Sequence, residues 1–511
     1  MKPPTRFSRS PVTAYRHSRG VLIPCGVFLA IGVGWSLAVS AFKVPPLLLP
    51  GPMAVFRTIF EERELLFQAA ASTLSEILLA IAIAVVTGFA TAILVGIRPL
   101  VRRTIFPYIL ATQVVPKVAL APILIAWFGI GMESRLILAF LISYFPMVIN
   151  TLAGILGTSD AMLRYAQSLA ASEWQILVKV RLPAAIPAIL SGVKITAGVA
   201  VIGIVVGEFV ATDSGLGKVI IDSSASMDTA LTVAATLLIG TLGLALLGAL
   251  ELAERRIVLA RMGARWRAVN WPALIFGAAI VSLWEALVRA LAPSQSLFPP
   301  PSYVMWSLYV RFDLIMEHAW PTFCQTLVGF LLSVVLGVAL GWIISKSRTL
   351  FEALYPVVVV LQVVPKEALA PLLVLWFGAG TLSRTALAFL IAFFPMVINT
   401  TFGVRSLNTA MRDYATSLLC NRWQFFTKVE LPWALTSILA GMKISVTLSV
   451  IGVVVAEIVA GRNGLGYLLL FAASRLDMGF SLAILLVLAI WGGALFAAVV
   501  LLEQRAVYWR R

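Results

Sequence analysis

Residues 113–129 read QVVPKVALAPILIAWFG, and residues 362–378 read QVVPKEALAPLLVLWFG. The two stretches differ at four positions and lie 249 residues apart (362 − 113 = 249). The same offset continues through further matched segments, Phe-Pro-Met-Val-Ile-Asn at 145–150 and 394–399 and Leu-Pro at 182–183 and 431–432. One offset held through so many Pro, Trp and Gly positions indicates a tandem duplication, so the pair of repeats is the unit of function.

The composition places the chain in a lipid bilayer. Its 511 residues are 60% hydrophobic and only 12% charged, whereas a soluble protein of this size needs a more polar surface. Several apolar runs exceed the roughly 20 residues that a helix needs to cross about 30 Å of hydrocarbon. We therefore expect an all-α membrane protein, with about six transmembrane helices in each of two repeats.

The expected spans follow from the apolar runs and the offset. In the first repeat they lie near 21–41, 72–97, 105–128, 134–156, 184–210 and 229–250, and in the second near 270–290, 321–346, 354–377, 383–405, 433–459 and 478–499. An even number of spans gives both repeats the same orientation, which is a parallel duplication. The expected divisions are a basic N-terminus at 1–20, a first repeat at 21–255, a linker at 256–269 and a second repeat at 270–511.

The net charge of +16 predicts an orientation. Nucleic-acid binding is the alternative meaning of such an excess, but Lys and Arg cluster at the ends of apolar runs, as they do in cytoplasmic loops. We expect no nucleic-acid partner, membrane lipid around the spans, and both termini and the linker in the cytoplasm. The apolar run after residue 20 is too long for the core of a signal peptide and recurs after residue 269, which favours a retained helix.

The sequence predicts neither a cofactor nor a metal site. The three cysteines do not correspond between the repeats, so no disulfide or metal framework is implied. Residues 214–219 are superficially similar to a phosphate-binding loop, but Thr212 stands where its first glycine should be. Val219 also replaces the Ser or Thr that would hold Mg²⁺. We expect the chain itself not to be an enzyme.

Taken together, these motifs resemble the membrane subunits of ATP-binding-cassette importers of the nitrate/taurine/sulfonate type. The resemblance covers residues 21–511, twice. It is carried by the Pro and Trp-Phe-Gly signature of the third span, by the Leu-Pro after a long cytoplasmic loop, and by a Glu followed by Gly-Leu-Gly near the outer end of the fifth span. It implies the type I importer fold, with both halves of the pore carried by one chain instead of two subunits.

The loop at 157–183 and its copy resemble the coupling motif of that family, which has an acidic residue, an Ala, a Gly and a final Leu-Pro. The matching positions are Arg164, Ala166, Ala170, Leu182 and Pro183 in the first copy and Asp413, Ala415, Leu419, Leu431 and Pro432 in the second. The acid is replaced by Arg164, and the Gly is replaced in both copies. We expect a helix in each loop, ended by the Leu-Pro. The resemblance implies two separate ATPase subunits, one for each loop.

Polar residues within the third spans are candidates for the translocation pathway, because ionisable groups in a span are costly. They are Gln113 and Lys117 in the first repeat and Gln362, Lys366 and Glu367 in the second. The lysines suit an anion, but snorkelling of their ammonium groups to the headgroups is an open alternative. The glutamines line the pathway or only bond neighbouring helices.

The outer ends of the fifth spans are candidates for contact with a periplasmic or lipid-anchored solute-binding protein. The residues are Glu208, Gly215 and Gly217 in the first repeat and Glu457, Gly464 and Gly466 in the second. Simple placement of these residues at the membrane interface is the alternative.

The function expected from these features is a permease subunit of an ATP-driven, binding-protein-dependent importer. The resemblance implies a small anion such as a sulfonate, taurine or nitrate, although similar permeases also carry vitamin precursors. A secondary transporter driven by an ion gradient is the alternative, since carriers too are built from repeats; paired docking loops would have no role in it. A membrane enzyme is disfavoured, because the sequence has no paired His, carboxylate cluster or nucleophile with a base.

The topology gives a first prediction. A reporter enzyme that works only in the cytoplasm should be active when it is fused within residues 251–269, and a reporter that works only outside the cell should be inactive there. The reason is that an even number of spans precedes this basic linker. Fusions between residues 42 and 71, which are predicted to lie outside the cell, are the control and should give the opposite result. An externally active reporter in the linker would contradict the topology.

Overall fold

The computed structural model describes residues 26, 29–30, 32–112, 116–210, 213–255, 271–291, 298–408, 411, 415, 417 and 420–507. Within these residues the chain forms helices and turns and no strand. The predicted all-α membrane fold is confirmed.

The first repeat contains α2 (Pro52–Glu61), α3 (Arg63–Ile97), α4 (Pro99–Ala111), η1 (Lys117–Leu120), α5 (Ala121–Phe128), α6 (Met132–Leu156), α7 (Asp160–Ser168), α8 (Glu173–Ile176), η2 (Leu177–Arg181), α9 (Leu182–Val210), α10 (Leu216–Ala225) and α11 (Thr229–Arg255). The second contains α12 (Trp271–Leu291), α13 (Pro301–Val310), α14 (Phe312–Lys346), α15 (Arg348–Val363), η3 (Lys366–Leu369), α16 (Ala370–Phe377), α17 (Thr381–Arg405), α19 (Arg422–Phe425), η4 (Phe426–Glu430), α20 (Leu431–Ala460), α21 (Leu465–Ser474) and α22 (Met478–Ala506).

Eight helices in the described part of the chain are long and apolar enough to cross a membrane. They are α3, α6, α11, α14, α17, α22 and the continuous runs Glu173–Val210 and Phe426–Ala460, and they stand where eight spans are predicted. Helix α12 occupies the place predicted for 270–290. The prediction for 21–41 lies largely outside the described residues, which show a short apolar helix at Gly32–Ala41.

The third span of each repeat is broken, so the spans predicted at 105–128 and 354–377 are not single continuous helices. Helix α4 ends at Ala111, and the chain resumes with the 3-10 turn η1 before the eight-residue α5. In the second repeat the two arms, Arg348–Gln362 and Lys366–Phe377, are bent by 79°. The cause is Pro116 and Pro365, because proline lacks an N–H donor and disfavours a helical residue before it.

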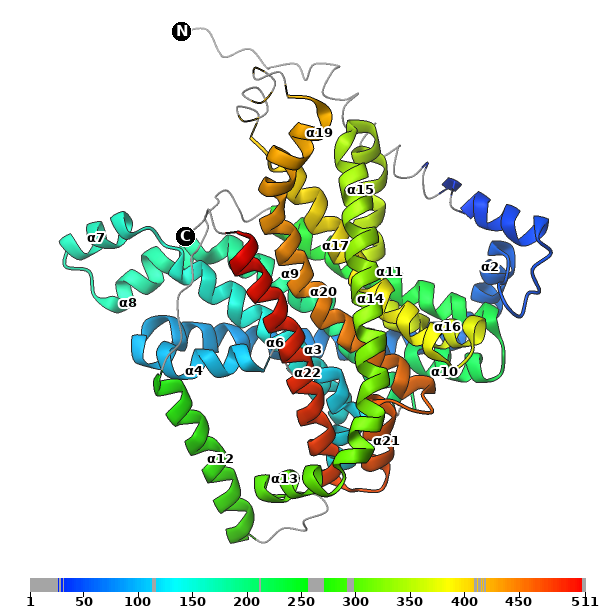
Figure 1. The fold of residues 1–511 in the computed structure, drawn as a ribbon, viewed down its shortest axis with the longest axis horizontal. Helices are drawn as coiled ribbons and strands as arrows, with labels where there is room; N and C mark the ends of the chain where they lie inside the picture. The colour runs from blue at the N-terminus through cyan, green and yellow to red at the C-terminus, as the bar shows by residue number, and fades with distance from the viewer. Residues whose placement is uncertain are drawn as a thin grey trace.

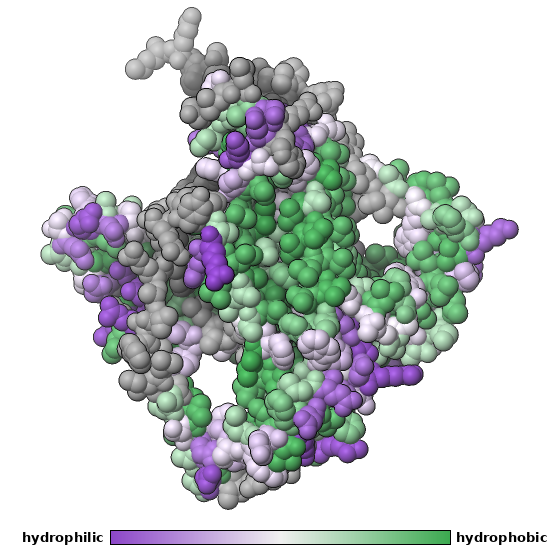
Figure 2. Space-filling model, viewed as in Figure 1, coloured by the Kyte–Doolittle hydropathy of each residue, from purple (hydrophilic) through white to green (hydrophobic). Residues whose placement is uncertain are grey.

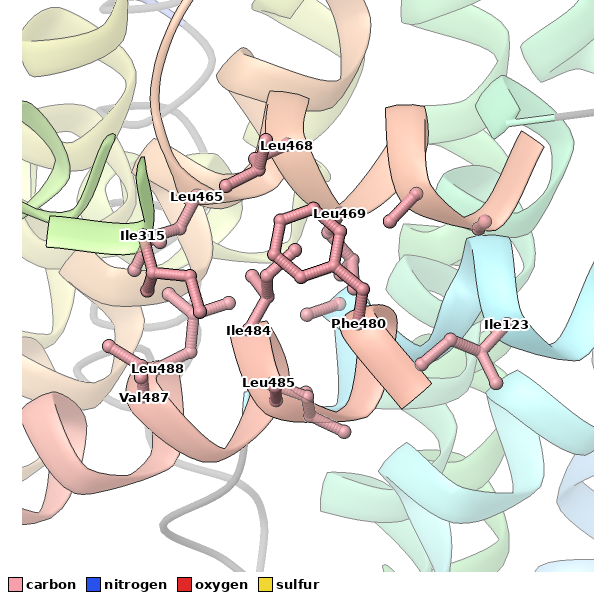
Figure 3. Packing of buried hydrophobic residues seen from close by; sticks show 14 of the residues in the cluster. Ile123, Ile315, Leu465, Leu468, Leu469, Phe480, Ile484, Leu485, Val487 and Leu488 are labelled. Atoms are coloured by element: carbon pink, nitrogen blue, oxygen red, sulfur yellow. The ribbon is translucent and has the colours of Figure 1, made fainter. Parts of the chain in front are cut away.

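The short helix after each break packs against the other repeat. In the first repeat α5 contacts α21 and η1 contacts α20, and in the second α16 contacts α10 and η3 contacts α9. Figure 3 shows Ile123 of α5 in the same buried cluster as Phe480 and Leu469 of the second repeat. A second cluster joins Val118 and Leu124 to the equivalent part of the second repeat, so the broken spans form much of the boundary between the repeats.

The tryptophans of the Trp-Phe-Gly signature add a reciprocal contact. Trp127 stacks on Phe298 of the second repeat, with ring centroids 5.6 Å apart. Trp376 donates its indole N–H to the carbonyl oxygen of Leu48 in the first repeat, at 2.6 Å. Each tryptophan therefore contacts a loop of the other repeat.

The surface is apolar over the central helices. Figure 2 shows a hydrophobic face across the middle of the molecule, with hydrophilic residues gathered toward its ends. On α14, Leu331, Val335 and Leu336 are all exposed. Exposed leucine and valine on long helices fit a surface in contact with lipid acyl chains.

Candidate functional site

The Gly-Leu-Gly turn of each repeat, predicted to lie on the outer side, is built around a buried glutamate. In the first repeat, Glu208 accepts hydrogen bonds from the Thr73 hydroxyl and from the backbone N–H of Gly217, both at 2.7 Å. Thr73 in turn accepts from the N–H of Leu216 at 2.9 Å. These two N–H groups open α10, where a helix leaves unpaired donors and a partial positive charge.

The second repeat repeats this arrangement. Glu457 accepts from the Thr322 hydroxyl and from the N–H of Gly466, both at 2.7 Å, and Thr322 accepts from Leu465 at 2.9 Å. The carboxylate therefore caps α21 as Glu208 caps α10.

The glycines of the Gly-Leu-Gly motif make room for these carboxylates. Gly215 and Gly464 adopt φ angles of +102° and +106°, a region that favours glycine. A Cβ on Gly215 would stand 2.0 Å from Glu208 Oε1, and one on Gly464 would stand 2.1 Å from Glu457 Oε1. The motif encodes a tight turn over a buried carboxylate.

This geometry bears on the predicted binding-protein face. Glu208 and Glu457 are only 2% and 0% exposed, and their carboxylate oxygens are occupied by groups of the same repeat. Contact between this end of the molecule and a partner stays a prediction. The glutamates would act through the turns that they hold and not by direct contact.

Sequence reasoning missed the partners of the two glutamates. Thr73 and Thr322 obey the 249-residue offset, as do Arg135 and Arg384, so the offset could have found them. The arginines are buried beside the turns: Arg135 pairs with Glu76 at 2.6 Å, whereas Arg384 donates to the side-chain oxygen of Asn463 at 2.5 Å. Position 76 is a glutamate in the first repeat, and its counterpart is Gln325.

The two lysines predicted to line the pathway lie at the breaks of the third spans. The ammonium nitrogen of Lys117 is 6.0 Å from the ring centroid of Phe145, and that of Lys366 is 5.0 Å from the matching Phe394. Lys366 is 8% exposed and donates to the carbonyl oxygen of Gln362 at 2.6 Å. Both ammonium groups therefore lie over aromatic rings of their own repeat. Gln113 lies outside the described residues.

Glu367 differs from its counterpart in the first repeat. It is 2% exposed, and its Oε2 has no hydrogen-bond partner within the described residues. The counterpart is Val118, which belongs to the apolar cluster between the repeats. A carboxyl thus stands at a position where the other copy has a hydrocarbon side chain.

The first predicted coupling loop contains two short helices, α7 and α8. Within α7, Arg164 is exposed and Ala166 is buried. Ala170, at the position of the glycine in the coupling motif, adopts φ +54°. This left-handed conformation costs a non-glycine residue about 1–2 kcal/mol, which explains the glycine of the motif and leaves the first copy strained there.

The predicted end of the loop helix at Leu-Pro is wrong in both copies. A π-helical turn, η2 or η4, runs directly into the next span, so Leu182 and Leu431 begin α9 and α20. Proline follows as the second residue, where its missing N–H is tolerated. Leu182, Leu431 and Pro432 are half-buried and Pro183 is exposed.

The second predicted coupling loop is described in part. Ala415 is 2% exposed, matching buried Ala166, whereas Asp413 and Leu419 lie outside the described residues. Asn421 and Gln424 exchange side-chain and backbone hydrogen bonds, as Ser172 and Gln175 do in the first loop. Figure 1 places α7 and α8 at one end of the molecule and α19 at another, so the two loops are well separated.

Comparison with known proteins agrees with the duplication. The family described as "binding-protein-dependent transport system inner membrane component" matches residues 77–259 and again residues 333–508. The chain belongs to this family. It carries the family's domain twice, as a fused permease of the ATP-binding-cassette importer class with several membrane-spanning helices in the inner membrane.

Relatives of this permease have the length of one repeat. A probable ABC transporter permease of Haemophilus influenzae is 36% identical over 225 residues, which are 44% of this chain and 91% of the relative. The formylaminopyrimidine transport permease ThiX of Halalkalibacterium halodurans is 32% identical, over 46% of this chain and 95% of its own. The taurine transport system permease TauC of Escherichia coli is 31% identical, over 47% of this chain and 90% of its own.

The mismatch between Glu367 and Val118 gives a prediction for this permease. Glu367→Val should raise the free energy of unfolding by about 1–3 kcal/mol, because it removes a buried carboxyl oxygen that has no partner among the described residues and introduces the side chain of the other copy. Thermal unfolding in detergent measures the change. Val118→Glu is the matched control and should lower stability. A loss of stability in Glu367→Val would contradict this interpretation.

Proposed function

We propose that the chain is the whole membrane-spanning subunit of an ATP-driven importer that takes a small anion from a solute-binding protein. Both termini and the linker lie in the cytoplasm, and two separate ATPase subunits dock on the two coupling loops. The proposal rests on two separated loops in one chain. Each loop contains a short capped helix, which continues through a π-helical turn into a span that begins with Leu-Pro.

The two coupling loops are unequal in this proposal. Arg164 places an exposed cation where the second copy has Asp413. A reversed charge at an interface changes partner choice and association rate more than overall affinity. The loops would therefore engage their ATPase subunits with different strength, or engage two different ATPase subunits.

The anionic solute is supported by the lysines of the broken spans. An anion that crosses the membrane interior needs compensation for its lost hydration, and Lys117 and Lys366 occupy matched positions beside the boundary between the repeats. Among the relatives, the putative aliphatic sulfonates transport permease and the nitrate import permease agree with this assignment.

A vitamin precursor is the second candidate solute. It is favoured by the formylaminopyrimidine permease, which is as similar to this chain as the taurine permease is.

The source of energy tests the class of transporter. In membrane vesicles that carry the chain with its ATPase and binding proteins, uptake should stop when ATP is withheld and continue when ionophores collapse the proton and sodium gradients. The physical reason is that the coupling loops transmit work from ATP hydrolysis. Uptake with the opposite pattern would identify an ion-driven carrier.

The lysines test the class of solute. Lys117→Met and Lys366→Met keep side-chain length and remove charge, so each should slow anion uptake about tenfold or more if its charge offsets a few kcal/mol of desolvation. Stimulation of ATP hydrolysis by the binding protein should persist. Lys43→Met, in an exposed outer loop, is the control. Normal uptake by the double variant would show that the lysines do not contact the solute.

A further inference from the structure

A hollow opens beside the outer turn of the first repeat. Its volume is about 530 Å³, and α3, α10 and α11 contribute its walls. Polar side chains line it, among them Gln68, Asp213, Lys218, Asp222 and Ser226. Asp213, Asp222 and Ser226 are exposed, and Lys218 lies 3.5 Å from Asp222, so the hollow is accessible and charged.

In the second repeat larger side chains stand at the matching positions. Ala69, Lys218, Asp222 and Ser226 of the hollow correspond to His318, Tyr467, Phe471 and Arg475. The ring of Tyr467 lies 6.0 Å from His318 and 6.3 Å from Phe471 between centroids, and the Arg475 guanidinium lies 4.2 Å above Phe471. His318 is fixed by the N–H of Gly464 at 3.0 Å. These side chains form an aromatic platform at the place that corresponds to the hollow.

The charges of the two places are opposite. The lining of the hollow carries two aspartates and one lysine, a net charge of −1. The matching positions carry Arg462, Arg475 and Glu317, a net charge of +1 with His318 neutral. The inversion is sharpest at the turn itself, where Asp213 of the first repeat corresponds to Arg462 of the second.

We propose that these two unlike surfaces dock the solute-binding protein in one orientation. One lobe of the partner inserts a basic side chain into the hollow of the first repeat, and the other lobe lays an acidic surface against Arg462, Arg475 and the aromatic platform. The inference rests on the proposed function, which supplies the binding protein and places α10 and α21 on the outer side.

Charge complementarity is the reason for this assignment. Opposite potentials on partner surfaces speed the encounter and fix its register, and like charges exclude the wrong pairing. Binding proteins close two domains around their ligand, so a pore of two identical halves offers such a partner two equivalent orientations. The fused chain offers one, because its hollow and its platform cannot exchange places.

The first test uses the binding protein that stimulates ATP hydrolysis by the reconstituted transporter. Asp213→Arg and Arg462→Asp should each raise the binding-protein concentration needed for half-maximal stimulation about tenfold, and more at low than at high salt. Arg103→Asp, the same change on an exposed residue of the inner side, should leave it unchanged. Unaltered stimulation in both outer variants would overturn the proposal.

The second test maps the orientation directly. A photo-crosslinking residue at position 226 should capture one lobe of the binding protein, and the same residue at position 475 should capture the other. Equal capture of both lobes from both positions would overturn the single orientation while leaving the importer function intact. If no binding protein stimulates the wild-type transporter, the proposed function itself fails, and this inference fails with it.

Discussion

The structure depends on one constraint: backbone N–H and C=O groups in the hydrocarbon core of a membrane must be hydrogen-bonded or buried in protein. Pro116 and Pro365 interrupt the third span of each repeat, so the segments after the breaks cannot face lipid. Each is instead buried against the other repeat, where Val118, Ala119 and Ala368 are at most 1% exposed. The breaks therefore oblige the two repeats to associate, and they place irregular backbone and its lysines beside the boundary between them.

The sequence alone determines most of this fold. One offset, apolar run lengths and the distribution of Lys and Arg predict a duplicated all-α membrane protein, and eight predicted spans stand as continuous helices. The breaks were missed because apolar periodicity does not register a bend, although the prolines signalled them. The roles of Glu208 and Glu457 were missed because their partners, Thr73 and Thr322, are 135 residues away in sequence.

Because both repeats are in one chain, their sequences can diverge at positions where an interaction is needed in only one repeat. A buried Glu76–Arg135 pair in the first repeat has no ionic counterpart at Gln325. Conversely, Glu430 is 4% exposed and pairs with Lys346 at 2.5 Å, and the matching residues in the first repeat are Arg181 and Ile97. By contrast, the carboxylate cap is the same in both copies, because each Gly-Leu-Gly turn leads into its own helix N-terminus, whose N–H groups need acceptors.

The contacts inside each repeat differ in kind from the contacts between the repeats, and this difference indicates where the molecule deforms most easily. Inside each repeat, a buried carboxylate joins α9 to the start of α10 or its counterpart and to a threonine of the long helix. Breaking such a contact leaves buried polar groups unpaired, which is costly. Between the repeats, most contacts are apolar side chains, and packed apolar surfaces can slide by small steps without exposing charge. Each repeat is therefore held as one body, and relative displacement of the two repeats disrupts fewer polar contacts than deformation of either.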